Sequence, residues 1–419
     1  MVNQASRLAD VRYDIRGPVL RRARALEAAG HEIIKLNIGN PAPFGLLTPD
    51  TVLSEVTASL ADSQGYSDAR GIAPAREAVA SYYRRRLGVP SATADDVFLG
   101  NGVSELIVMT LQALLNPGDE VLVPAPDYPL WTGAVSLCGG RAVHYRCAEG
   151  LNWNPDVEHV AAQVSPRTKA LVIINPNNPT GAVYSRETLL ALLDIARRHN
   201  LLVLTDEIYD QIVYDGAEHY CAASLAPDIP VFSLGGLSKT YRLAGFRSGW
   251  LVVCGPKEPI AEYLEGLELL ANMRMCPNVP AQRAIPAALD GGIDITPLLA
   301  PGGRLRDQRD RAWELLTAID GVDCYKPAGA LYVFPRLDPE VHKIVDDQRM
   351  CIDLLEQKHV LLTHGTGFNL SSADHIRIVF LAPVQTLTEA IGRLGEFLSG
   401  YRQLAALDLP LGGTLRLSA

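Results

Sequence analysis

The chain has 419 residues, of which 48% are hydrophobic and 20% are charged, and its formal net charge is −9. This is an ordinary globular composition, and the length exceeds what one hydrophobic core serves, so we expect two to three compact units. The negative charge and the scattered arginines argue against a nucleic-acid partner. No apolar run reaches the roughly 18 residues of a membrane span.

The amino-terminal segment has no apolar core flanked by basic residues, so we expect no secretory signal. The seven cysteines are spread along the chain, and none forms a C-x-x-C pair. An odd number of scattered cysteines is typical of buried free thiols in a reducing compartment. We therefore expect a cytoplasmic protein, and we predict no metal site.

From residue 95 onward, short apolar runs alternate with helical patterns. The apolar runs cover residues 97–99, 120–123, 142–145, 169–174, 201–204, 231–234 and 251–253, and helical spacing covers residues 104–115 and 185–199. Unbroken apolar runs suit strands buried on both faces, and their alternation with helices predicts an α/β fold with a mostly parallel sheet between helices. Ligands of such sheets bind beyond the carboxyl ends of the strands, so polar residues directly after a strand are candidate site residues.

The character of the chain changes near residue 296. A Pro-Gly-Gly break at 301–303 is followed by short strand-like runs, at 330–334 and 375–380, that mix with helices. We predict a smaller α+β domain at 296–419, a large domain at 49–295 that holds the ligand site, and an N-terminal segment at 1–48 that packs with the small domain.

Lys239 follows the predicted strand at 231–234. A lysine at the mouth of a sheet, in apolar surroundings, can form a Schiff base with an aldehyde, and the alternative is a lysine that faces solvent. Arg247 lies between glycines, and its forked guanidinium suits phosphate. Ser238 offers a hydroxyl to the same anion.

Two more groups follow predicted strands. Asp206 can keep a pyridine nitrogen protonated, and Tyr209 can share its crevice; a helix N-cap is the alternative role for Asp206. The loop Asn175–Gly181 crowds three amides and two prolines together, which can place an amide with little loss of entropy. A turn without function is the alternative there.

Three weaker signals complete the set. The glycine-rich turn at 100–105 precedes a helix whose free backbone N–H groups can bind phosphate, although it matches neither a P-loop nor a dinucleotide fingerprint. Tyr128 offers an aromatic face for stacking, or packs ordinarily. Arg377 lies in an apolar run, where its charge needs a partner: a substrate carboxylate or a structural salt bridge.

Three motifs, in this order, resemble those of class I aminotransferases with the fold of aspartate aminotransferase. They are NPNNPTG at 175–181, DEIY at 206–209 and SKTYRLAGFR at 238–247, with Arg377 downstream. The resemblance covers nearly the whole chain. It implies a pyridoxal 5'-phosphate enzyme that acts on amino acids and 2-oxo acids, and a homodimer whose active sites are shared across the interface.

The resemblance also implies a role for each candidate. Lys239 would be the Schiff-base lysine and the acid/base, Asp206 would bind the pyridinium nitrogen, and Tyr128 would stack on the ring. Tyr209 and Asn178 would bind the ring oxygen. The phosphate would be held by Gly102, Val103, Ser104, Ser238 and Arg247, and by Tyr66 of the partner subunit. The substrate α-carboxylate would be held by Arg377, Asn178 and the Gly39 backbone.

Four further segments resemble the bacterial alanine (glutamate–pyruvate) aminotransferases, which move an amino group between L-alanine and 2-oxoglutarate. These are YDIRGP at 13–18, LNIGNP at 36–41, NGVSE at 101–105 and PDYPLW at 126–131. Gly367 stands where that pattern has alanine. We expect Tyr13 and Arg16 to contact substrate, and we hypothesise that Arg16 binds the side-chain carboxylate of glutamate; a surface role is its alternative.

Other functions fit the same scaffold. An aspartate or broader-specificity (valine–pyruvate) aminotransferase would share these motifs, and a lyase or synthase would share every cofactor residue. Turnover that depends on a keto acid distinguishes a transferase from a lyase. The lack of a helix-turn-helix extension or a basic face disfavours a cofactor-binding regulator, and a non-catalytic assembly protein would fail to bind the cofactor.

Overall fold

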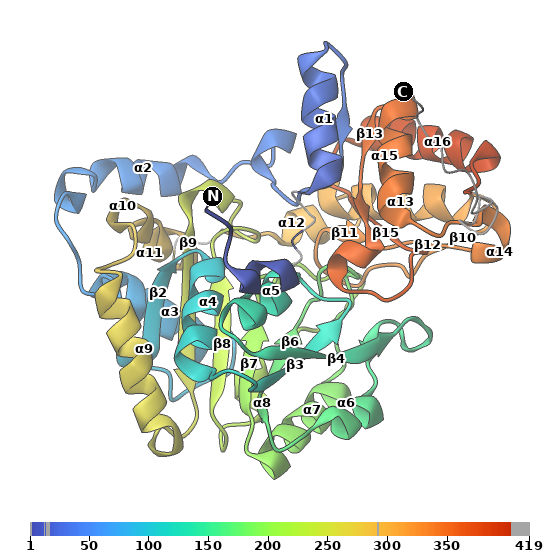
Figure 1. The fold of residues 1–419 in the computed structure, drawn as a ribbon. Coiled ribbons are helices and arrows are strands. Elements are labelled where there is room, and N and C mark those ends of the chain that lie inside the picture. Colours follow the sequence, from blue (N-terminus) through green and yellow to red (C-terminus); the bar gives the residue numbers. More distant parts are fainter. Residues whose placement is uncertain (1, 12, 14–16, 291–292, 404–419) are drawn as a thin grey trace, which may run out of the picture.

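The structure is a computed structural model that describes residues 2–11, 13, 17–290 and 293–403. An eight-stranded sheet forms the centre of its larger part (Figure 1). Its strands, in spatial order, are β2 (Val97–Asn101), β9 (Ser248–Cys254), β8 (Val231–Gly236), β7 (Leu202–Asp206), β6 (Thr168–Ile174), β3 (Glu120–Ala125), β4 (Arg141–Ala148) and β5 (Asn154–Pro155). β9 runs antiparallel to both of its neighbours and β5 antiparallel to β4, while β3, β4, β6, β7 and β8 run parallel. All seven predicted apolar runs overlap these strands, and the predicted α/β class is confirmed.

The inner strands of the sheet, such as β7 and β8, are largely apolar because both faces of the sheet are covered. In β7, for example, Val203 joins one hydrophobic cluster and its neighbour Leu204 joins another, since side chains alternate along a strand. The first cluster includes residues of α2 (Asp50–Ala58), α3 (Ala73–Arg85), α6 (Val157–Gln163), α7 (Arg186–His199), α8 (Ala222–Leu225) and α11 (Ala284–Asp290). The second includes residues of α4 (Val103–Leu114), α5 (Leu130–Leu137) and α9 (Ala261–Met273). The short α10 (Val279–Gln282) packs beside α11.

This topology gathers the candidate residues at one edge of the sheet. The carboxyl ends of β3, β6, β7 and β8 lie together because these strands are parallel. β9 is antiparallel to β8, so the residue before it, Arg247, lies at the same edge as Lys239, which follows β8. Residues far apart in the sequence therefore surround one site.

The smaller part of the molecule contains short strands and longer helices (Figure 1). Its three-stranded sheet has the order β11 (Tyr332–Val333), β15 (Ile376–Val379), β14 (Thr363–His364), and β10 (Val322–Asp323) pairs with β12 (Arg336–Leu337). Its helices are α12 (Thr296–Leu299), α13 (Arg304–Thr317), α14 (Pro339–His342), α15 (Asp347–Lys358) and α16 (Val384–Gly400).

The N-terminal segment lies against this smaller part. Strand β1 (Ile34–Lys35) pairs in parallel with β13 (Val360–Leu361), and Val19 and Ala23 of α1 (Pro18–Ala28) join its hydrophobic cluster. The N-terminal helix α1 and strand β1 thus share a hydrophobic core with the elements that follow residue 296.

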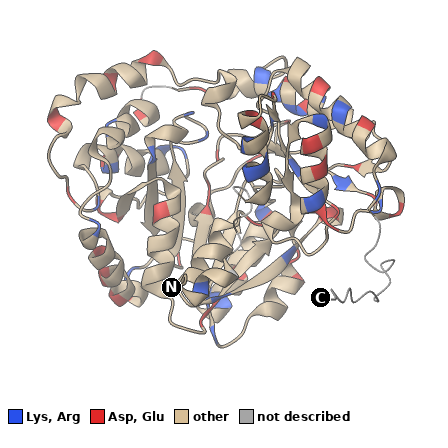
Figure 2. Ribbon diagram, turned by 45° about the horizontal axis from the view of Figure 1, so that its top comes forward, with Lys and Arg blue, Asp and Glu red and all other residues tan. Residues whose placement is uncertain are grey.

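Acidic and basic residues are intermingled on the helices around the molecule (Figure 2). None of the described helices is long and apolar enough to cross a membrane. Within the described ranges, no group of three or more His, Cys, Asp or Glu side chains is arranged to hold a metal ion. All seven cysteines are free thiols, but the expectation that all are buried is wrong for Cys138, Cys276 and Cys324, which are half-buried.

Candidate active site

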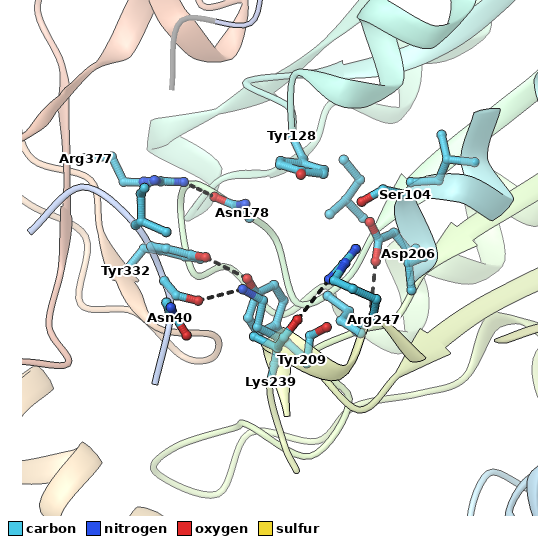
Figure 3. Close-up of a pocket in the computed structure, with 18 of the residues that line it drawn as sticks. Asn40, Ser104, Tyr128, Asn178, Asp206, Tyr209, Lys239, Arg247, Tyr332 and Arg377 are labelled. Atoms are coloured by element: carbon cyan, nitrogen blue, oxygen red, sulfur yellow. Dashed lines mark hydrogen bonds between the residues drawn. The ribbon is translucent and has the colours of Figure 1, made fainter. Parts of the chain in front are cut away.

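A cavity of about 590 Å³ lies between the edge of the large sheet and the small sheet (Figure 3). Twelve residues predicted from the sequence line it: Tyr13, Gly39, Val103, Ser104, Tyr128, Asn178, Asp206, Tyr209, Ser238, Lys239, Arg247 and Arg377. Gly102 adjoins the lining at Val103. Tyr66 lies outside the cavity with 82% of its surface exposed, and Arg16 lies outside the described residues.

Lys239 lies in the turn after β8 and is half-buried. Its Nζ donates a hydrogen bond to the backbone oxygen of Gly39 at 2.7 Å, and it lies 5.8 Å from the centre of the Tyr209 ring. The amine therefore faces the cavity, and the alternative of a solvent-facing lysine is wrong.

Asp206 is the last residue of β7, and its side chain is buried. Two long hydrogen bonds reach its carboxylate, from Trp131 Nε1 and from the Ile208 backbone, each at 3.4 Å. Burial raises the pKa of Asp206 to about 6, although these bonds and Lys239 act to lower it. A turn rather than a helix follows, so the N-cap alternative is wrong. The carboxylate keeps acceptor capacity for a cationic partner in the cavity.

One end of the cavity is suited to an anion. Helix α4 begins at Val103, directly after Gly102, which has a φ of +83°. A Cβ at Gly102 would collide with the guanidinium of Arg247, so glycine is needed for this close approach. The backbone N–H groups at the helix start, the Ser104 and Ser238 hydroxyls and Arg247 are donors of the kind that suit a phosphate.

Arg377 lies on β15 at the opposite side of the cavity, and its side chain is buried. Its Nη1 donates to Asn178 Oδ1 at 2.9 Å, and its Nη2 donates to the backbone oxygen of Asn37. The guanidinium carbon lies 4.5 Å from the ring centre of Tyr332 and 4.6 Å from that of Phe368. Among the described residues no carboxylate pairs with it, so the salt-bridge alternative is wrong and the cation suits an incoming carboxylate.

A seam beside Tyr128 joins the two sides of the cavity. Asp127 accepts hydrogen bonds from Thr132 Oγ1 at 2.6 Å and from Asn369 Nδ2 at 2.8 Å, and its backbone N–H donates to the Phe368 oxygen at 3.0 Å. Burial raises the pKa of this carboxyl group to about 7, against these hydrogen bonds. At the neighbouring Gly367, a Cβ would lie 3.0 Å from His364 Nε2, so glycine relieves crowding there.

Several residues that line the cavity or contact its lining were not predicted from the sequence. Tyr332 lies in an apolar run, where nothing marks its hydroxyl as functional, yet it lines the cavity. Trp131 belongs to the PDYPLW segment, which was a usable signal for its bond to Asp206. Asn37 acts through its backbone oxygen, which no side-chain pattern reveals. Tyr13 lines the cavity, and its hydroxyl lies 2.9 Å from that of Tyr128.

Comparison with known proteins agrees with this geometry. Residues 31–394 match the family described as aminotransferase class I and II, and the chain belongs to this family. It is 57% identical over 400 residues to the alanine aminotransferase of Mycobacterium tuberculosis H37Rv, covering 96% of this chain and 93% of that one. It is 55% identical over 403 residues to the glutamate–pyruvate aminotransferase AlaA of Escherichia coli K12, with 96% and 99% coverage.

Solved structures give the same result. An aminotransferase from Escherichia coli, 54% identical, superimposes with a TM-score of 0.95 and covers 96% of this chain and 100% of its own. An alanine aminotransferase from Pyrococcus furiosus, 38% identical, gives 0.89, with 94% and 99% coverage.

Proposed function

We propose that the protein is an alanine aminotransferase, which transfers the amino group between L-alanine and 2-oxoglutarate to give pyruvate and L-glutamate. The observation that carries the proposal is one cavity that combines the Lys239 amine, the buried Asp206 carboxylate and the buried Arg377 cation. The relatives named alanine and glutamate–pyruvate aminotransferase, at 57% and 55% identity, support the choice of substrates.

The cavity fits pyridoxal 5'-phosphate as the cofactor. Asp206 is a buried carboxylate with spare acceptor capacity, which suits a protonated ring nitrogen. The start of α4, with Arg247 and Ser238, suits the phosphate, with Tyr66 of the partner subunit as a further proposed donor. When bound, this cofactor supplies an aldehyde for Lys239 and an electron sink for the reaction.

The residues of this chain then divide the work of two successive half-reactions. Arg377 and Asn178 hold the α-carboxylate of the substrate, which fixes its Cα near Lys239. Lys239 Nζ removes the proton from Cα and later returns a proton, a role that contributes about 10²–10⁴-fold to the rate. Asp206 holds a proton on the ring nitrogen, and Tyr209 donates to the ring oxygen.

The choice between a methyl and a carboxyethyl side chain needs a separate group. We propose that Arg16 binds the side-chain carboxylate of glutamate and leaves alanine untouched. Tyr13, three residues earlier, lines the cavity beside Tyr128, which supports this part of the chain as substrate-binding.

We also propose a homodimer in the cytoplasm, with neither nucleic acid nor membrane as a partner. Large apolar side chains are exposed on and just beyond α9: Leu269 at 60%, Met273 at 73% and Met275 at 54%. Exposed apolar clusters commonly mark protein interfaces. The exposure of Tyr66 supports its proposed reach into the partner's cavity.

The test is the visible spectrum of the purified protein with added pyridoxal phosphate. A band that disappears with L-alanine and returns with 2-oxoglutarate is the expected result. A band that responds to L-aspartate alone would contradict alanine as the donor, and turnover without a 2-oxo acid would indicate a lyase. No visible band at all would overturn the role of Lys239.

A further inference from the structure

Tyr332, on strand β11 of the small sheet, contacts a candidate site residue of the large-sheet side, Tyr209. Its side chain is 2% exposed, and its hydroxyl lies 2.7 Å from that of Tyr209 (Figure 3). β11 pairs with β15, placing Tyr332 opposite Val379, two residues after Arg377. The small sheet therefore delivers a hydroxyl as well as a guanidinium to the cavity.

The position of this hydroxyl is fixed from two further directions. The guanidinium of Arg377 packs on the Tyr332 ring at 4.5 Å, a cation–π distance. The Tyr332 hydroxyl also lies against Gly39, where a Cβ would collide with it. The backbone oxygen of Gly39 accepts the Lys239 hydrogen bond, so Tyr332 lies at the centre of the catalytic groups.

Two hydroxyls at this distance share one proton, so one tyrosine donates and the other accepts. Burial and the neighbouring Tyr332 raise the pKa of Tyr209. Burial acts to raise the pKa of Tyr332 too, but Lys239 and Arg377 outweigh it and lower that pKa. Asp206, Tyr13 and Tyr128 are the other titratable groups around the pair. The Arg377 cation packs on the Tyr332 ring at 4.5 Å, and a cation beside a phenol makes its hydroxyl the better donor, which favours Tyr332 as the donor of the pair.

We propose that Tyr332 is a positioning residue whose hydroxyl donates to Tyr209 and so directs the proton of Tyr209 into the cavity, toward the cofactor's ring oxygen. This inference rests on the proposed function. Hydrogen bonds in a chain strengthen one another, so donation by Tyr332 makes Tyr209 a stronger donor. A residue on a short strand of the small sheet thereby strengthens the hydrogen bond that Tyr209, on the large-sheet side, would donate to the cofactor's ring oxygen.

The test uses Tyr332→Phe, which keeps the ring under Arg377 and removes the hydroxyl. A weaker donor to the ring oxygen destabilises its deprotonated form. In the cofactor-loaded protein the pH midpoint of the visible band should therefore rise by about half a unit to one unit. The dissociation constant of pyridoxal phosphate, followed by tryptophan fluorescence of the cofactor-free protein, should rise roughly two- to tenfold. The KM for alanine should stay within about twofold, while kcat falls.

A double-mutant cycle shows whether Tyr332 acts through Tyr209. Tyr209→Phe should raise the midpoint further than Tyr332→Phe, and the double variant should match Tyr209→Phe alone. Additive shifts would overturn the proposal. The matched control is Tyr145→Phe, which removes a buried hydroxyl bonded to the Val172 oxygen at 2.8 Å, outside the cavity, and should leave the midpoint unchanged.

Failure of this inference is distinct from failure of the proposed function. If wild-type protein shows no visible band with cofactor, the proposed function is wrong. If wild-type protein is loaded and transaminates, but Tyr332→Phe has the wild-type midpoint and cofactor affinity, the positioning role is wrong. A fall in thermal stability with an unchanged midpoint would indicate a merely structural hydroxyl.

Discussion

The two sides of the cavity are built differently. Asp206, Lys239 and Arg247 adjoin strands of five to seven residues in a sheet covered on both faces. Tyr332 and Arg377 lie on strands of two and four residues in a three-stranded sheet. The large-sheet side holds the groups proposed to bind the cofactor, together with Asn178, while the small-sheet side holds Arg377, proposed for the substrate, and Tyr332, proposed to position Tyr209. The groups proposed for proton transfer thus adjoin the longer strands, while the guanidinium proposed for substrate recognition lies on a shorter one.

The largest expected effect tests the large-sheet side. Lys239→Ala should lower kcat about 10⁴-fold, because it removes the proposed acid/base group. Steady-state kinetics with alanine and 2-oxoglutarate measure this. Lys169→Ala, which removes an exposed lysine paired with Asp119 at 3.7 Å, is the control and should keep its activity. Comparable losses in both variants would contradict the assignment.

The seam between the two sides can be tested through stability. Because burial raises the pKa of Asp127 to about 7, the folded protein binds a proton there that the unfolded chain releases near pH 4. The bound proton therefore contributes to the free energy of unfolding. This contribution is fully present below about pH 4 and is lost as the pH rises to about 7. Asp127→Asn should remove this pH-dependent fall in stability, which amounts to up to about 4 kcal/mol.

Urea unfolding of wild type and Asp127→Asn at several pH values checks this prediction. As the pH rises, the free energy of unfolding of the variant should increase relative to that of wild type. Asparagine cannot ionise, but it can still form hydrogen bonds with Thr132 and Asn369. Parallel curves for the two proteins would mean that Asp127 titrates near its ordinary range.

On the small-sheet side, Arg377→Lys should lower kcat/KM about 10- to 100-fold for alanine and for glutamate alike. Lysine keeps the charge but loses the forked hydrogen bonds to the α-carboxylate that both substrates share. The two kcat/KM values, measured in each direction, provide the check. A loss confined to one substrate would place Arg377 at a side chain instead.

The smallest expected effect concerns discrimination between the two substrates. Arg16→Ala should raise the KM for glutamate about tenfold and change that for alanine little, because alanine has no side-chain carboxylate. Arg24→Ala, on the same N-terminal segment, is the matched control and should change neither. Equal changes in both KM values would contradict the proposal that Arg16 binds the side-chain carboxylate of glutamate.

The same contrast explains which features could be predicted from the sequence. Unbroken apolar runs such as 169–174 mark strands buried on both faces, and the polar residues after them mark the large-sheet side of the cavity. Tyr332 could not be predicted as a site residue, because its strand is short and its neighbours in the sequence are apolar. Its importance arises from pairing with β15 and from the approach of Gly39, neither of which leaves a local pattern.

The pairing of β1 with β13 also constrains the order of events during synthesis. Asn37 and Thr363, which share a hydrogen bond beside these strands, are separated by 326 residues. The whole large sheet emerges from the ribosome between them, and it can acquire its core while α1 and β1 still lack their partner. Closing so long a loop is slow. The N-terminal segment is therefore among the last parts to be buried, and until then it is open to chaperones and proteases.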